Sequence, residues 1–122
     1  MLNLDTHVVV FFLDGTLTQK EKAACAGEDL CISDIVLWEL AKLIQLNRLQ
    51  MDLTGKEFQT FLKNVTVFPI SREVAVQSTS LDFTADPADE IIAATSVVHG
   101  HRLLTRDRRI LKSRIVPLAK SV

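Results

Sequence analysis

The chain has 122 residues, enough for one domain whose hydrophobic core is stable without disulfides or structural metal ions. We expect a single domain over residues 1–122. With 48% hydrophobic residues, 24% charged residues and a net charge of −1, it has the composition of an ordinary soluble globular protein. Cys25 and Cys31 are too few and too oddly spaced for a disulfide framework or a zinc site, which favours reduced thiols in the cytoplasm. The apolar run 7–13 is too short to span a bilayer and lacks a basic leader, so we expect no membrane association.

The first segment ends in an acid, Asp5, and leaves two interpretations open for the residues after it. Residues 6–13 are rich in β-branched and aromatic side chains, which favours a strand. Alternatively the strand stops at Asp5, Thr6 caps, and a buried helix follows. Periodicity cannot separate these interpretations because nearly every position is apolar.

The next elements follow from turn and capping residues. We expect a turn at 14–16, a polar helix from Gln19 to about Gly27, a strand at 30–32 closed by Ser33 as N-cap, and a mostly buried helix at 34–46. Beyond them we expect a helix begun by a capping box at 54–57 and ending near Lys63, a strand at 65–70, and a helix at about 72–80 capped by Ser71.

The stretch 86–107 combines a helix with a strand. Asp86 is expected to cap the helix, with Pro87 in its first turn and Gly100 just past its end. A short buried strand at 102–104 follows, and 115–118 reads as a last edge strand. Strands alternate with helices throughout, which predicts an α/β fold with a central, mainly parallel sheet covered on both faces.

Four acids lie at positions in this arrangement from which their side chains could meet. Asp5 and Asp107 follow strands, Asp89 lies in the first turn of a helix, and Glu39 lies at the margin of the helix at 34–46. Strand ends and the following helix starts lie on one edge of a parallel sheet, so these side chains can converge. For a single Glu or a capping Asp, a purely structural role is also open.

Converging carboxylates favour a divalent cation. Bare carboxylates at short range are costly unless a cation neutralises them, and hard oxygen ligands select Mg²⁺ or Mn²⁺. The chemistry this allows is metal-assisted hydrolysis of a phosphodiester. Three hydroxyl residues, expected to orient the carboxylates or metal-bound water, are Thr6, Ser96 and Thr105.

The C-terminal segment is basic. From Arg102 onward there are seven Lys or Arg and one acid, which fits a phosphate-bearing partner or a solvated face. The residues expected to contact the phosphates of such a partner are Arg106, Arg108, Arg109 and Lys112.

The chain resembles the PIN-domain nucleases, and among them the VapC-type toxins of bacterial type II toxin–antitoxin pairs. The segments that carry the resemblance are LDTHVVV at 4–10, ISDIVLWELAKL at 32–43, DPADEIIAATS at 86–96 and LLTRD at 103–107. They stand in the order of the family's motifs and together cover essentially the whole chain.

The resemblance implies a three-layer α/β/α sandwich and a Mg²⁺- or Mn²⁺-dependent endoribonuclease. It also implies a homodimer held inactive by a small antitoxin protein. By motif position it assigns the catalytic and metal-binding acids as Asp5, Glu39, Asp89 and Asp107. It favours the helix for residues 6–13, against propensity. One departure is Glu90, where similar proteins often carry Arg.

Two rival interpretations are weaker. The segment FFLDGTLT at 11–18 resembles the haloacid-dehalogenase phosphatase motif, but Phe12 stands where that motif has its nucleophile and only Asp14 of the acid pair is present. A catalytically inactive PIN scaffold that only binds a partner is the other alternative, and four intact acids argue against it.

Overall fold

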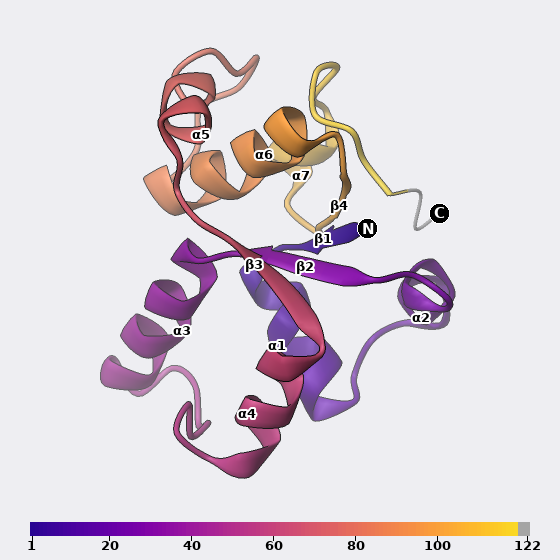
Figure 1. Cartoon of the computed structure of the whole chain (residues 1–122), viewed down its shortest axis with the longest axis vertical. Coiled ribbons are helices and arrows are strands. Elements are labelled where there is room, and N and C mark those ends of the chain that lie inside the picture. The colour runs from indigo at the N-terminus through magenta and orange to yellow at the C-terminus, as the bar shows by residue number, and fades with distance from the viewer. Residues whose placement is uncertain (120–122) are drawn as a thin grey trace.

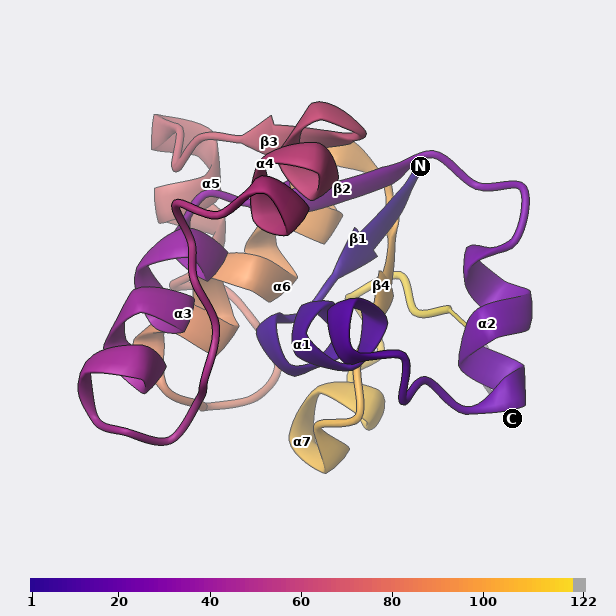
Figure 2. The ribbon, with the colours of Figure 1, turned by 90° about the horizontal axis from the view of Figure 1, so that it is seen from below.

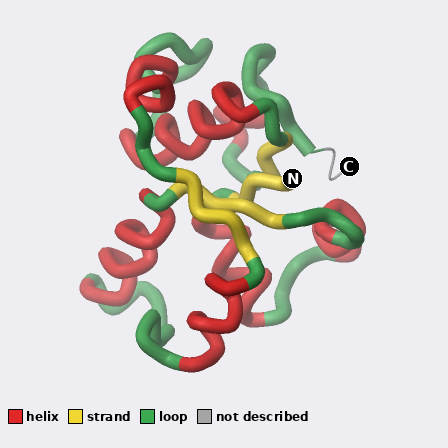
Figure 3. The backbone as a smooth tube through the Cα atoms, in the orientation of Figure 1, coloured by secondary structure: helices red, strands yellow, loops and turns green. Residues whose placement is uncertain are grey.

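A four-stranded parallel sheet lies at the centre of the protein, seen here in a computed structural model that describes residues 1–119. The strand order is β3-β2-β1-β4, with bounds β1 Leu2–Leu4, β2 Leu30–Ser33, β3 Val65–Phe68 and β4 Arg102–Leu104. All three pairings between neighbouring strands are parallel. Figure 3 shows the strands as the central layer, so the predicted parallel sheet is confirmed.

Helices cover both faces of this sheet. In Figure 1, α5, α6 and α7 lie above the sheet, α1, α3 and α4 lie below it, and α2 lies beside it. The bounds are α1 Thr6–Asp14, α2 Gln19–Cys25, α3 Ile35–Gln45, α4 Lys56–Lys63, α5 Arg72–Gln77, α6 Pro87–His99 and α7 Arg108–Leu111. This is the expected three-layer α/β/α sandwich. Within the described range, no helix is both long enough and apolar enough to cross a bilayer.

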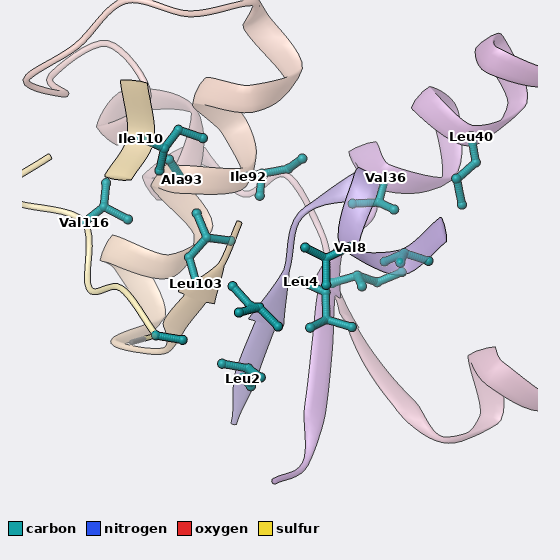
Figure 4. Packing of buried hydrophobic residues seen from close by; sticks show 14 of the residues in the cluster. Leu2, Leu4, Val8, Val36, Leu40, Ile92, Ala93, Leu103, Ile110 and Val116 are labelled. Atoms are coloured by element: carbon teal, nitrogen blue, oxygen red, sulfur yellow. The ribbon is translucent and has the colours of Figure 1, made fainter. Parts of the chain in front are cut away.

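The core explains why β1 and its neighbour β4 are so apolar. Leu2 and Leu4 of β1 and Leu103 of β4 are fully buried, because helices pack on both sides of these strands. Figure 4 shows Leu4 beside Val8 of α1, and Leu103 on the side where Ala93 of α6 and Ile110 of α7 lie. Burying whole Leu and Ile side chains stabilises the fold by about 1.5–3 kcal/mol each.

The segment after Asp5 is a helix, despite its β-branched composition. The Asp5 side chain accepts a 2.8 Å hydrogen bond from the Thr6 backbone N–H and caps α1. The helix ends at Gly15, whose positive φ of 77° suits a residue without a Cβ. Val8 and Val9 are buried against the sheet, so tertiary packing overrides local propensity here.

Several expected caps differ from the structure. The hydroxyl of Thr54 donates to Asp52, and α4 begins instead after Gly55 without a side-chain cap. The cap position of α3 is Asp34, one residue later than expected, although Ser33 Oγ still accepts from the Ile35 backbone N–H. Asp86 occupies the cap position of α6 without making a capping hydrogen bond, so only its position was predicted correctly.

Two expected elements also need correction. The last strand is reduced to one bridge between Leu103 and Leu118, because Pro117 has no backbone N–H to continue a ladder. The helix α3 is less buried than its apolar composition predicts. The Trp38 side chain on α3 is 54% exposed, so it does not belong to the core.

Candidate active site

Three acids from separate elements meet at the carboxyl edge of the sheet. Asp5 follows β1, Asp107 follows the neighbouring β4, and Asp89 lies in the first turn of α6. Together with His7, Phe11 and Arg106, they line a cavity of about 300 Å³. Figure 2 shows α1 and α7 following β1 and β4 at the same edge of the sheet.

The Asp5 carboxylate is the most rigidly held of the three. Its Oδ2 accepts a 2.6 Å hydrogen bond from the Thr105 hydroxyl, while Oδ1 accepts from the Thr6 backbone N–H. Asp5 is only 3% exposed, and this burial raises its pKa even though the hydrogen bonds oppose the shift. The side chain is therefore fixed in place and poorly solvated.

Thr105 links the first and the last of the acids. Its Oγ1 donates to Asp5 and accepts a 3.0 Å hydrogen bond from the Asp107 backbone N–H. Asp107 in turn caps α7, accepting from the backbone N–H groups of Arg109 and Ile110. One buried hydroxyl thus sets the relative position of two acid-bearing segments, in line with the orienting role expected for Thr105.

Glu39 reaches the site through Thr6 and does not line the cavity. The Thr6 hydroxyl donates to Glu39 Oε1, so one residue pairs with Asp5 through its backbone and with Glu39 through its side chain. Burial raises the pKa of Glu39, and the nearby charges of Asp5 and Asp86 add to the shift. Glu39 therefore belongs to the same electrostatic cluster from an outer position.

The pKa of Asp89 responds to burial and to this crowding of acids. Its pKa is raised to about 7, first by burial and then by the charges of Asp5, Glu39, Asp107 and Asp86. The charged form is disfavoured because it is partly desolvated among like charges. A carboxyl group in this state binds a proton or a cation near neutral pH.

The carboxylates do not yet form a closed coordination sphere. In residues 1–119, no three His, Cys, Asp or Glu side chains are close enough together to hold one ion. That the four acids lie within reach of one or two cations therefore stays a prediction. Glu39 pairs with Thr6, and carboxylates without a cation repel one another. The donor set itself, all carboxylate oxygen, fits a hard divalent cation.

Ser96 lies away from the acids. It is fully buried on α6, and its Oγ accepts a 2.9 Å hydrogen bond from Asn3 Nδ2 of β1. The Asn3 amide also donates to the Ile92 carbonyl, so Ser96 helps to fasten α6 to the central strand. Among the described hydrogen bonds, none joins Ser96 to a carboxylate.

The basic residues divide into two groups. Arg108 and Lys112 are exposed on and after α7, and Arg109 Nη2 lies 3.7 Å from Asp107 Oδ2. Arg106 is instead paired with Glu21 of α2 through hydrogen bonds of 2.6 and 2.7 Å. Arg106 lines the acid cavity, whereas the other three extend the positive charge along the surface.

Three residues at this site were not predicted as functional from the sequence. His7 and Phe11 line the cavity because α1 starts directly at Asp5 and turns this face toward the acids. Glu21 is 4% exposed, and its position relative to Arg106 depends on tertiary packing. The local signal for Glu21 was its capping box with Thr18, which does not indicate its partner.

A second cavity lies away from these acids. Its volume is about 330 Å³, and it is located between the end of α1 and the start of α4, beside Leu13, Met51 and Phe58. None of the four predicted acids lines it. The three acids that meet at the sheet edge therefore belong to the first cavity alone.

Comparison with known proteins agrees with this architecture. A PIN-domain profile matches residues 3–114. Ribonuclease VapC22 of Mycobacterium tuberculosis (strain ATCC 25618 / H37Rv) is 32% identical over 117 residues, covering 91% of this chain and 90% of that protein. A toxin–antitoxin complex from Klebsiella pneumoniae matches with a TM-score of 0.74 at 19% identity, over 100% of this chain and 98% of that chain. VapBC2 from Rickettsia felis, bound to a promoter DNA fragment, matches with a TM-score of 0.72 at 16% identity over 97% of both chains.

Proposed function

The chain belongs to the PIN-domain family, and we propose that it is a Mg²⁺- or Mn²⁺-dependent endoribonuclease, the toxin of a type II toxin–antitoxin pair. The observation that carries this proposal is the meeting of Asp5, Asp89 and Asp107 around one cavity, with the Asp89 pKa raised to about 7. The name of the 32% identical ribonuclease supports RNA as the substrate.

The acids at the cavity would hold the metal. Asp5, Asp89 and Asp107 supply carboxylate oxygens from the cavity wall, and Glu39 supplies negative charge from the outer position. A bound divalent cation activates a water molecule and offsets the charge that develops on the phosphate. Thr105 and Thr6 keep the carboxylates of Asp5 and Glu39 oriented, which limits the reorganisation needed on binding.

The basic residues on α7 would hold the RNA backbone. The basic residues come directly after Asp107, which lines the acid cavity. Phosphates that flank the reacting one can therefore reach Arg108, Arg109 and Lys112. These contacts would not distinguish one base from another. Binding through them depends on salt, because neutralising phosphates releases counterions.

A small antitoxin protein is the proposed regulatory partner. The toxin–antitoxin complexes with similar folds support this partner class. An antitoxin side chain of Arg or Lys placed among the acids would replace the charge of the cation and exclude both metal and RNA. The toxin would act in the cytoplasm, where its RNA substrate lies.

A homodimer is also part of this proposal. Trp38 on α3 is 54% exposed, and Leu46 just after α3 is 58% exposed, so the protein carries apolar surface on this side. A second copy would bury that surface. Light scattering at micromolar concentration tests this, since a monomer that keeps its mass on concentration would contradict a dimer.

The phosphatase alternative is disfavoured by the turn at 14–16. Asp14 Oδ1 accepts from the Thr16 backbone N–H, and Asp14 does not line the acid cavity. Its neighbour Phe12 offers no nucleophile at the position where that motif needs one.

The experiment compares an RNA oligonucleotide with a small phosphomonoester as substrate. We expect cleavage of RNA, lost in Asp5→Asn and kept in the matched variant Asp14→Asn. Hydrolysis of the phosphomonoester that depends on Asp14 would favour the phosphatase. A folded protein without either activity, which still binds the antitoxin, would favour the inactive scaffold.

A further inference from the structure

The loop that carries Asp107 is tied to α2 by an ion pair. Arg106 Nε donates to Glu21 Oε2 at 2.7 Å, and Arg106 Nη2 donates to Glu21 Oε1 at 2.6 Å. This two-point geometry is the strongest way for a guanidinium to bind a carboxylate. The Arg106 guanidinium also stacks over the Phe11 ring, with its Cζ atom 3.8 Å from the ring centroid.

The Glu21 side chain is also held by Thr18, the residue that caps α2. The Thr18 backbone N–H donates to Glu21 Oε1 at 2.8 Å, and the Thr18 hydroxyl accepts from the Glu21 backbone N–H. These donors and Arg106 lower the pKa of Glu21 to about 2, with Arg106 as the largest cause. The Glu21 carboxylate therefore stays ionised at neutral pH and keeps its hold on the guanidinium.

Arg106 shares a cavity with three other carboxylates. It lines the same cavity as Asp5, Asp89 and Asp107, and Asp107 is its neighbour in the chain. The Arg side chain is long and flexible, and three uncompensated carboxylates attract a cation strongly. Without Glu21, this attraction would draw the guanidinium toward the acids, in competition with Asp14, whose charge also raises the pKa of Arg106.

We propose that Glu21 is a positioning residue: it holds Arg106 at the rim of the acid cavity and keeps that guanidinium out of the metal site. Arg106 keeps its Nη1 group, which makes no hydrogen bond to another described residue, for a phosphate of the bound RNA. This inference rests on the proposed function, because it assumes that the acids bind a metal. It also predicts that Arg106 is an RNA-binding residue only while Glu21 orients it.

The test measures Mn²⁺ binding to the purified metal-free protein by isothermal titration calorimetry. Glu21→Gln keeps an acceptor oxygen for the Thr18 N–H but loses the charge that holds Arg106. We expect it to weaken Mn²⁺ binding by roughly three- to thirty-fold, which lies within the range of coupling energies between residues of one hydrogen-bond or salt-bridge network. The double variant Glu21→Gln/Arg106→Met should bind Mn²⁺ within about two-fold of the wild type, since the competing cation is gone.

Two controls separate competition from simple loss of structure. Thr18→Ala weakens the cap of α2 without changing any charge, and should leave Mn²⁺ affinity unchanged. Arg106→Met alone should leave Mn²⁺ affinity unchanged or higher, and should weaken RNA binding measured in EDTA. If Glu21→Gln binds Mn²⁺ as the wild type does, or if the double variant fails to restore binding, the inference is wrong. If the wild type itself binds no Mn²⁺, the proposed metal site fails and this inference fails with it.

Discussion

The Thr105 hydroxyl donates a 2.6 Å hydrogen bond to the Asp5 carboxylate, although the two residues are 100 positions apart in the chain. Both groups are buried, at 3% exposure each, so the bond is shielded from water. Because Thr105 also accepts from the Asp107 backbone N–H, it fixes the ends of β1 and β4 against each other. The first prediction follows from this bond.

Thr105→Val keeps the shape of the side chain and removes its hydroxyl. We expect RNA cleavage to fall by about 10- to 100-fold, as for other residues that orient metal-binding carboxylates. Stability should fall by about 1–3 kcal/mol, because Asp5 loses a partner in a buried position. Thr95→Val is the matched control: its buried hydroxyl donates to the Ile91 carbonyl within α6, away from the acids. Equal cleavage by the two variants would contradict the orienting role.

The Asp89 pKa predicts how stability depends on pH in metal-free protein. The folded-state pKa of about 7 lies above the ordinary value of 3.8, so between these values the folded state binds more protons than the unfolded state. Stability therefore falls as the pH rises through this window. Asp89→Asn removes the cost of the charge and should raise the melting temperature at pH 8 in EDTA by about 3–6 °C, for a gain of about 1 kcal/mol.

The stability gain from Asp89→Asn should itself depend on pH. The advantage of Asp89→Asn should shrink as the pH is lowered from about 7 and be lost below 3.8, where the wild-type carboxyl is protonated in both states. Asp29→Asn makes the same change of charge at an exposed position before β2, and should show no such trend. A stability gain for Asp89→Asn that does not change with pH would contradict the raised pKa.

Much of the fold was predictable because apolar strands and turn residues are local signals. The strand at Arg102–Leu104 was predicted from its apolar residues, whereas for Leu2–Leu4 the sequence left open whether the strand stops at Asp5. Residues 6–13 were not decidable from propensity, since the helix there is selected by burial against the sheet and by the Asp5 cap. The expected strand at 115–118 was wrong. Only one bridge forms, at Leu118, because Pro117 has no backbone N–H to continue a ladder.

The acid site was predictable in its members and less so in its geometry. A parallel sheet places Asp5 and Asp107 at the same edge, and the pairing of β1 with β4 brings them together. The outer position of Glu39 depends on one hydrogen bond from Thr6, which no spacing rule indicates. The pairing of Arg106 with Glu21 lies beyond sequence inference for the same reason, because the partners are 85 residues apart.

The basic surface on α7 predicts a salt effect on RNA binding. Replacing Arg108 and Arg109 with Ala should weaken RNA binding and reduce its salt dependence by about one unit of slope or less for each lost contact. Cleavage of bound RNA should change much less. Lys63→Ala/Arg72→Ala removes the same charge from exposed positions on α4 and α5 and serves as the control. An unchanged slope in the α7 variant, measured by fluorescence anisotropy, would assign these arginines to another partner.

The central claim, a carboxylate site that works through a divalent cation, is tested most directly by chelation and metal add-back during RNA cleavage. The wild type should cleave an RNA oligonucleotide in Mg²⁺ or Mn²⁺, stop in excess EDTA and resume when the cation is restored. Asp107→Asn keeps an oxygen that can cap α7, so it should stay folded and lose at least about 100-fold in cleavage at any metal concentration. Cleavage that continues in EDTA, or an Asp107→Asn variant as active as the wild type, would contradict the account.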